Sequence, residues 1–205
     1  MSDFYSRRSV LSGLAALPFL SSLGAQTASA QAITHTNIHG LPPARFDPQL
    51  VATGKTEWLP GELHVVPDDF YLYFMLKNGN AIRYGVGVGR GNLYESGTFW
   101  VQRKQEWPSW TPTPDMIARQ PEEYEQYKDG VPGGPNNPLG ARALYLHTAS
   151  GRDSYLRIHG TNAPSTIGSA VSNGCARLTN EYVQDLYPRV ALGAKVVLYP
   201  KGMRP

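Results

Sequence analysis

The chain has 205 residues, of which 41% are hydrophobic and 17% charged, a balance typical of a globular domain that can bury a core. Its 19 basic and 16 acidic residues leave a net charge of +3 without any long lysine or arginine run, which argues against nucleic-acid binding. The 21 glycines and 17 prolines favour short strands and turns over long helices.

Residues 1–30 are predicted to be an export signal outside the fold. A basic start at Arg7 and Arg8 precedes an apolar stretch that is too short, and too broken by glycine, proline and serine, to span a bilayer. The small residues that end at Ala30 predict cleavage there. The paired arginines favour the twin-arginine route, and an ordinary secretory signal remains the alternative. We therefore expect a periplasmic protein.

The predicted mature chain is almost neutral and carries one cysteine. Removing residues 1–30 takes away Arg7, Arg8 and Asp3, so 17 basic (19 − 2) and 15 acidic (16 − 1) residues remain, a net charge of +2. Cys175 cannot form an internal disulfide, and an unpaired thiol in an oxidising compartment predicts a use for it. No cysteine lies near the cleavage point, so we expect no lipid or other stable membrane anchor.

The first half of the mature chain predicts a β-meander. Residues 31–60 form an extended, proline-containing lead-in, and the domain itself is predicted at residues 61–200, followed by a tail at 201–205. Asn78–Gly79 is a strong hairpin signal. It lies between the last two of three predicted strands, at Leu63–Val66, Phe70–Leu76 and Ala81–Gly89.

Glycines 85, 87 and 89 alternate with valines in the third of these strands. Such a strand has one bare face, which another backbone or a ligand can approach closely. The stretch "GVGVGRG" lacks the Lys–Ser/Thr ending and the following helix of a nucleotide-binding loop, so we reject that function for it.

A long irregular connection follows the next predicted strand, Ser96–Trp107. Residues 108–140 are rich in proline, with short helical turns expected near Asp115–Arg119 and Glu122–Lys128. A connection of this length in a compact domain is often a lid or a binding loop. A surface excursion that covers a sheet edge is the equally favoured alternative.

The last third of the chain predicts strands at Ala141–Thr148, Ser154–Gly160 and Ala194–Tyr199. Between the last two, apolar residues at helical spacing predict a helix that starts at Thr179 or Asn180 and is limited by Pro188. The fold class predicted from these elements is mostly β, a sandwich or barrel with one short helix after Cys175.

His159 and Cys175 are the candidate catalytic pair. An imidazole that takes the thiol proton activates a cysteine for attack on a carbonyl carbon, and the resulting ion pair predicts a depressed pKa for Cys175. The turn formed by Ser172, Asn173 and Gly174 is of a type whose backbone N–H groups converge on one oxygen, as in an oxyanion hole. Arg177 is a candidate for holding a substrate carboxylate or bracing the loop.

Purely structural roles are the alternative for both residues, since a lone cysteine is more often a buried small hydrophobe. One cysteine and scattered histidines offer no zinc site of the usual spacing. We expect no metal, and we assign no catalytic role to His35, His39, His64 and His147.

The stretches "HGT" at 159–161, "TIG" at 166–168, "SNGCARL" at 172–178 and "NEYVQDLY" at 180–187 closely resemble the L,D-transpeptidase catalytic domain (YkuD-type). The resemblance covers roughly residues 62–200. It implies a mostly β fold and a periplasmic cell-wall enzyme that needs no cofactor. It further implies that Cys175 is the nucleophile and His159 the base, with the Gly160 carbonyl orienting the imidazole and the amides of residues 173–175 forming the oxyanion hole.

The implied substrate is a peptidoglycan tetrapeptide stem, held as a thioester after release of D-alanine. The implied acceptor is an amine of another stem or a lysine of an outer-membrane protein, and the sequence does not name which. Many family members have histidine where this chain has Asn173, which cannot titrate near neutral pH. Two alternatives stay open: a stem hydrolase that uses the same residues, and a non-catalytic wall-binding module.

Overall fold

The structure is a computed structural model that describes residues 40–205. The predicted export signal at residues 1–30, the first part of the lead-in, His35 and His39 lie outside the described residues. Among residues 40–205, no helix combines the length and hydrophobicity that a membrane crossing requires.

Short strands make up most of the secondary structure, which confirms the predicted mostly β class. The helices are α1 (Pro114–Arg119), α2 (Pro121–Tyr124) and α3 (Asn180–Arg189). The strands are β1 (Gln49–Ala52), β2 (Leu63–Val66), β3 (Tyr71–Met75), β4 (Asn80–Gly85), β5 (Val88–Gly89), β6 (Gly97–Glu106), β7 (Arg142–His147), β8 (Asp153–His159), β9 (Ala170–Ser172), β10 (Ala176–Arg177) and β11 (Lys195–Leu198).

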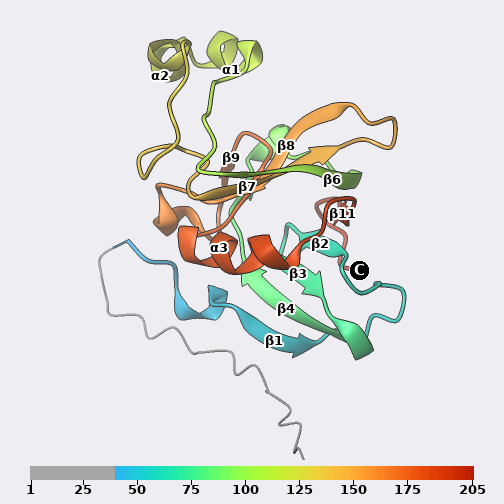
Figure 1. Ribbon diagram of the computed structural model, residues 1–205. Helices are drawn as coiled ribbons and strands as arrows, with labels where there is room; N and C mark the ends of the chain where they lie inside the picture. Colours follow the sequence, from blue (N-terminus) through green and yellow to red (C-terminus); the bar gives the residue numbers. More distant parts are fainter. Residues whose placement is uncertain (1–39) are drawn as a thin grey trace, which may run out of the picture. The chain divides into compact units, whose positions relative to one another are not determined.

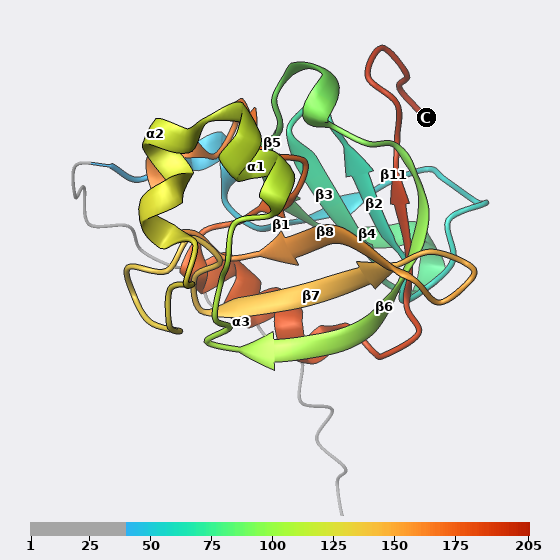
Figure 2. The same ribbon diagram turned by 90° about the horizontal axis from the view of Figure 1, so that it is seen from above.

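One nine-stranded sheet in the order β1-β4-β3-β2-β11-β6-β7-β8-β10 organises the domain. It is antiparallel except where β2 pairs with β11 and β8 with β10. The sheet bends so that its two halves face each other, with α3 alongside (Figures 1 and 2). Buried side chains of both halves, such as Leu72 and Leu144, join those of α3, such as Leu186, in one core cluster. This is a sandwich made from a single folded sheet.

The hairpin at Asn78–Gly79 forms as predicted. Asn78 has φ 62° and Gly79 has φ 71°, which are the two positive φ angles of a type I′ turn. The turn joins β3 to β4, whose residues Met75 and Ala81 are register partners.

The predicted strand Ala81–Gly89 is divided, because β4 ends at Gly85 and β5 pairs with β9 instead of continuing in the large sheet. The glycines do permit close approach. A Cβ on Gly89 would lie only 2.7 Å from the Tyr94 Cα and 3.0 Å from the Gly174 Cα. The turn before Cys175 therefore packs directly on this glycine strand.

Three strands are absent from the sequence prediction. The lead-in contains β1, which pairs with β4 at the edge of the sheet, so describing residues 31–60 as extended alone was incomplete. The other two, β9 and β10, are three and two residues long, too short for a periodic pattern to show.

Helix α3 begins at its predicted cap and ends one residue beyond Pro188. The Thr179 hydroxyl accepts a hydrogen bond from the Tyr182 N–H at 3.2 Å. At the other end, the Lys104 ammonium donates to the carbonyl oxygens of Tyr187 at 2.6 Å and Val190 at 2.7 Å. A cation at a helix C-terminus satisfies carbonyls that have no helical partner.

We expect Lys104→Met to lower the free energy of unfolding by about 1–3 kcal/mol, because two charge-assisted hydrogen bonds are lost from partly buried carbonyls. Urea denaturation measures this change. The matched control is Lys128→Met, which removes an exposed lysine that pairs only with Glu125 at 3.4 Å and should cost under about 0.5 kcal/mol. Equal stabilities for the two variants would contradict this role for Lys104.

Candidate active site

The parallel pairing of β8 with β10 brings the two candidate catalytic residues together. Ala176 is paired with Ile158, and Arg177 with His159. Ile158 and Ala176 are buried in the core. Because side chains alternate along strands, Cys175 and His159 belong to the opposite face. Extending the register by one residue places their Cα atoms about 8 Å apart diagonally, from strand spacings of about 4.8 Å and about 3.3 Å per residue.

Cys175 is a partly buried residue directly before β10. Its thiol donates a weak hydrogen bond to the Tyr155 carbonyl oxygen, with Sγ and oxygen 3.9 Å apart. Tyr155 adopts φ 60°, a rare conformation for a residue with a side chain. Within the described residues the thiol does not hydrogen-bond to the His159 ring. Catalytic hydrogen bonds often form only once substrate is bound, so this resting geometry does not separate the pair.

His159 is held as a neutral imidazole. Its side chain is 4% exposed, and its Nδ1 lies 2.5 Å from the Gly160 carbonyl oxygen. Burial, reinforced by the positive charge of Arg177, lowers the pKa of His159 to about 3. A neutral ring whose Nδ1–H donates to the carbonyl keeps an unprotonated Nε2 as its basic atom. A Cβ on Gly160 would collide with Asn180 Oδ1, so glycine is required there.

The predicted depressed pKa of Cys175 is wrong for the resting structure. Burial raises the pKa of the Cys175 thiol, although the N–H of Arg157 and the charges of Arg157 and Arg177 act in the opposite direction. Burial disfavours the charged form of both partners. The resting site therefore contains a neutral thiol and a neutral imidazole, not the thiolate–imidazolium pair expected from the sequence.

The turn before Cys175 is fixed by Ser172. The Ser172 hydroxyl donates to the Cys175 carbonyl oxygen at 2.6 Å and accepts from the Gly174 N–H at 3.2 Å. The Gly174 amide is thus occupied and does not match the implied oxyanion hole. In the described part of the chain, the N–H groups of Asn173 and Cys175 make no backbone hydrogen bond and remain the donors that an oxyanion can use.

Arg177 braces the site from β10, two residues after Cys175. Its backbone exchanges two hydrogen bonds of 2.9 Å with Gly87, and its guanidinium reaches the Thr166 hydroxyl at 3.4 Å. Its buried Nε has no partner within the described residues. These contacts support the bracing alternative from the sequence analysis and do not test carboxylate binding.

Arg157 is a site residue that the sequence analysis missed. Its guanidinium forms a two-pronged ion pair with Asp153, at 2.6 and 2.8 Å, and lies 4.3 Å from the centre of the Tyr145 ring. Arg157 precedes His159 by two residues, so strand alternation alone places both on one face. That periodicity was the available signal.

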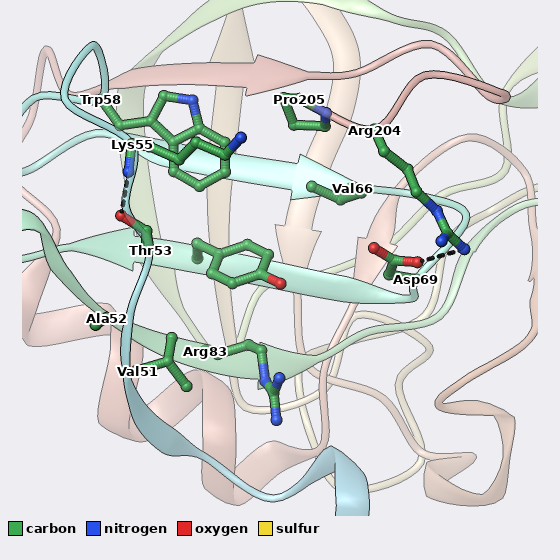
Figure 3. Close-up of a pocket in the computed structure, with 11 residues that line it drawn as sticks. Val51, Ala52, Thr53, Lys55, Trp58, Val66, Asp69, Arg83, Arg204 and Pro205 are labelled. Carbon is green, nitrogen blue, oxygen red and sulfur yellow. Dashed lines mark hydrogen bonds and ion pairs between the residues drawn. The ribbon is translucent and has the colours of Figure 1, made fainter.

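His64 and the pocket described next are separate from the candidate catalytic pair. His64 packs against Trp58, with ring centres 4.1 Å apart, and contacts Glu62 at 3.1 Å, a structural arrangement. A pocket of about 190 Å³ at the β1–β4 end of the sheet is lined by residues such as Tyr73 and Arg83 and by none of the predicted site residues (Figure 3). Within residues 40–205, no three His, Cys, Asp or Glu side chains gather as metal ligands.

Comparison with known proteins identifies relatives over most of the described domain. The L,D-transpeptidase catalytic domain family (YkuD) matches residues 60–198. The probable L,D-transpeptidase ErfK/SrfK of Escherichia coli (strain K12) is 38% identical over 137 residues, covering 65% of this chain and 42% of that protein. The chain thus spans about two fifths of the length of this curated relative.

Two solved structures share the fold. A Brucella melitensis protein, named as a probable carnitine operon oxidoreductase, is 46% identical with a TM-score of 0.52, covering 77% of this chain and 96% of that one. L,D-transpeptidase 3 from Mycobacterium tuberculosis is 16% identical with a TM-score of 0.50, covering 67% of this chain and 60% of that one. The oxidoreductase name belongs to the Brucella melitensis protein and is not transferred to this chain.

We expect stability to fall in acid because His159 is buried neutral. A folded-state pKa of about 3, against 6.5 for the ordinary group, means that the unfolded chain binds the proton first. Stability is complete above pH 6.5 and is lost as the pH falls from there toward 3. Between pH 7 and pH 5, wild type should lose about 2 kcal/mol more than His159→Asn in urea denaturation. The control His147→Asn should keep the full loss, and identical losses in all three proteins would refute the assignment.

Proposed function

Because the chain belongs to the L,D-transpeptidase catalytic domain (YkuD) family, we propose that it is a cysteine L,D-transpeptidase acting on peptidoglycan tetrapeptide stems. The observation that supports this most is the β8–β10 register, which places Cys175 and His159 on one face of the sheet. Cys175 is partly buried, His159 is held neutral, and the N–H groups of Asn173 and Cys175 make no backbone hydrogen bond within residues 40–205. These are the parts that acyl transfer through a thioester needs.

The first half-reaction forms the thioester. With a stem bound, the Cys175 thiol turns from the Tyr155 carbonyl toward His159, whose Nε2 takes the proton as the sulfur attacks the carbonyl carbon of the third residue. The carbon–nitrogen bond to D-alanine breaks, and the His159 imidazolium returns the proton to the leaving amine. The Gly160 carbonyl oxygen, which already accepts the hydrogen bond from His159 Nδ1–H, stabilises the transient positive charge of the imidazolium.

The charges around Cys175 and His159 favour a proton transfer that occurs together with the attack of sulfur on the carbonyl carbon. They disfavour a thiolate–imidazolium pair that exists before substrate binds. Arg157 and Arg177 favour the thiolate, while the same charges disfavour a protonated His159. Sulfur therefore gains its negative charge only when the carbonyl carbon is there to share it. The N–H groups of Cys175 and Asn173 donate to the oxyanion that develops.

The second half-reaction passes the acyl group to an amine. His159 Nε2 removes a proton from the acceptor amine as nitrogen attacks the thioester carbon, and the sulfur leaves and regains a proton. The amine belongs to another stem or to a lysine of an outer-membrane protein. No metal or organic cofactor enters either step.

The remaining segments fit an exported enzyme. We propose that residues 1–30 direct export to the periplasm and are removed after Ala30, that residues 31–60 lead into the domain, and that residues 61–200 carry the activity, with residues 201–205 as a tail. Peptidoglycan lies in that compartment, and a single unpaired cysteine is consistent with a catalytic thiol there.

We expect Cys175→Ala to abolish acylation with the fold intact, and His159→Gln to slow it by about 10²- to 10⁴-fold because the general base is lost. A tetrapeptide stem is incubated with a diamino-acid acceptor, and intact-mass spectrometry follows both the acyl-enzyme and the product. A carbapenem, which the family resemblance implies as an acylating agent, provides a second readout at Cys175. Turnover by Cys175→Ala would refute this mechanism.

The product distinguishes the alternatives in the same assay. Transfer gives the stem–acceptor adduct, a hydrolase gives only the free tripeptide, and a wall-binding module gives neither product nor an acyl-enzyme. The wild-type protein should give the adduct.

The pH dependence of thiol reactivity tests the neutral resting pair. Because burial raises the pKa of Cys175, we expect the iodoacetamide rate to rise with pH through a midpoint above that of free cysteine. The pKa of His159 is about 3, so the profile should show no step near pH 6.5. A midpoint below that of free cysteine would instead establish a stored thiolate–imidazolium pair.

A further inference from the structure

The side chain of Asn173 joins the turn before Cys175 to the long connection 108–140. Its Nδ2 donates to the Tyr124 hydroxyl oxygen at 2.8 Å. Its Oδ1 accepts from the guanidinium groups of Arg90 at 3.4 Å and Arg119 at 3.5 Å. Tyr124 ends α2, Arg119 ends α1, and Arg90 follows β5. One amide thus ties the cysteine turn to both short helices and to the glycine strand.

A second polar contact supports the same attachment. The Arg90 guanidinium donates a hydrogen bond to the side-chain oxygen of Gln120, the residue that joins α1 to α2. Gln120 in turn donates to Glu123 at 3.0 Å. Arg90 therefore binds the helical segment directly and through Asn173.

The segment has little else to hold it in place. Helices of six and four residues are far below the length at which a helix is stable alone. Its own apolar cluster is small: the rings of Tyr124 and Tyr127 pack edge-on against Trp110, at 6.2 and 5.9 Å. The two hydrogen bonds between Trp110 and Val131 close its base. The contacts to Asn173 and Arg90 thus help to hold α1 and α2 beside the Cys175 turn.

The two helices stand on the side of the sheet where β8 ends at His159, as both ribbon views show (Figures 1 and 2). Tyr124 is 8% exposed, and its hydroxyl meets Asn173 in a partly buried contact. A thioester that waits for an amine is lost if water reaches it first. The closed segment is therefore placed to influence which acceptor reaches the sulfur-bound carbon.

We propose that Asn173 is a positioning residue that latches the α1–α2 segment, residues 114–128, over the Cys175 turn through the Tyr124 hydroxyl. The latched segment limits water at the thioester and so favours amine acceptors, a role that rests on the acyl transfer proposed above. The Asn173 amide carries two N–H donors and an acceptor oxygen on one terminal group, whereas a neutral imidazole has one N–H donor and one acceptor nitrogen at separate positions of its ring.

Tyr124→Phe tests the latch, because it removes the hydroxyl and keeps the ring that packs on Trp110. Loss of one hydrogen bond should raise the open population by roughly 2- to 10-fold. We expect the ratio of stem–acceptor adduct to free tripeptide to fall by the same factor. In the resting enzyme, alkylation of Cys175 by iodoacetamide should speed up and hydrogen exchange in residues 114–128 should increase.

Tyr127→Phe is the matched control, since Tyr127 also packs on Trp110 but makes no contact with Asn173. It should leave every readout at the wild-type value. Asn173→Ala should change the ratio at least as much as Tyr124→Phe, and adding Tyr124→Phe to it should change nothing further, because both remove one shared bond.

A Tyr124→Phe protein whose product ratio, alkylation rate and exchange all equal those of Tyr127→Phe overturns the latch. Alkylation and exchange need no substrate, so they judge the latch even if the wild-type protein forms no thioester. That last result would instead overturn the proposed function. Thermal melting of each variant separates opening of the segment from unfolding of the domain.

Discussion

The site depends on a strand of two residues. β10 lies between β8, its parallel partner, and Gly87, with which Arg177 exchanges two hydrogen bonds of 2.9 Å. Leu178 adds a bond from its N–H to the His159 carbonyl at 2.8 Å. Held on both sides, this short segment fixes which face of the sheet Cys175 occupies. A slip of one residue would turn the sulfur into the core, because side chains alternate.

Burial then decides the chemistry of the pair. A charged group loses hydration in the interior, so both the thiol and the imidazole rest in their neutral forms. Arg157 and Arg177 bias the charge that does form toward sulfur. Arg157 is itself fixed by Asp153 and the Tyr145 ring, which keeps its charge in place. Burial therefore favours the protonated thiol in the resting site.

The long connection 108–140 reaches the turn that precedes Cys175. Its residues Arg119 and Tyr124 contact Asn173, two positions before Cys175. The sequence left these two roles open because proline-rich composition marks a long loop but not its destination. Asparagine at position 173, where many family members have histidine, can be interpreted only once its hydrogen-bond partner, the Tyr124 hydroxyl, is known.

Local signals settled much of this protein. Asn78–Gly79 dictated a type I′ hairpin because both positions accept positive φ, and Thr179 marked the start of α3 because its hydroxyl satisfies a helix-end N–H. The spacing and neighbours of His159 and Cys175 identified the candidate pair. Such features are legible because each depends on a few adjacent residues.

Three things depended on tertiary structure. β1, β9 and β10 form only because partners elsewhere in the chain complete their hydrogen bonds. The Gly174 amide is occupied because Ser172 Oγ turns back on it. The pKa of Cys175 is raised and that of His159 is lowered, in both cases mainly by burial. No local sequence pattern encodes this burial. The sequence identifies the candidate pair, but burial and contacts between distant residues determine the protonation state of its two side chains.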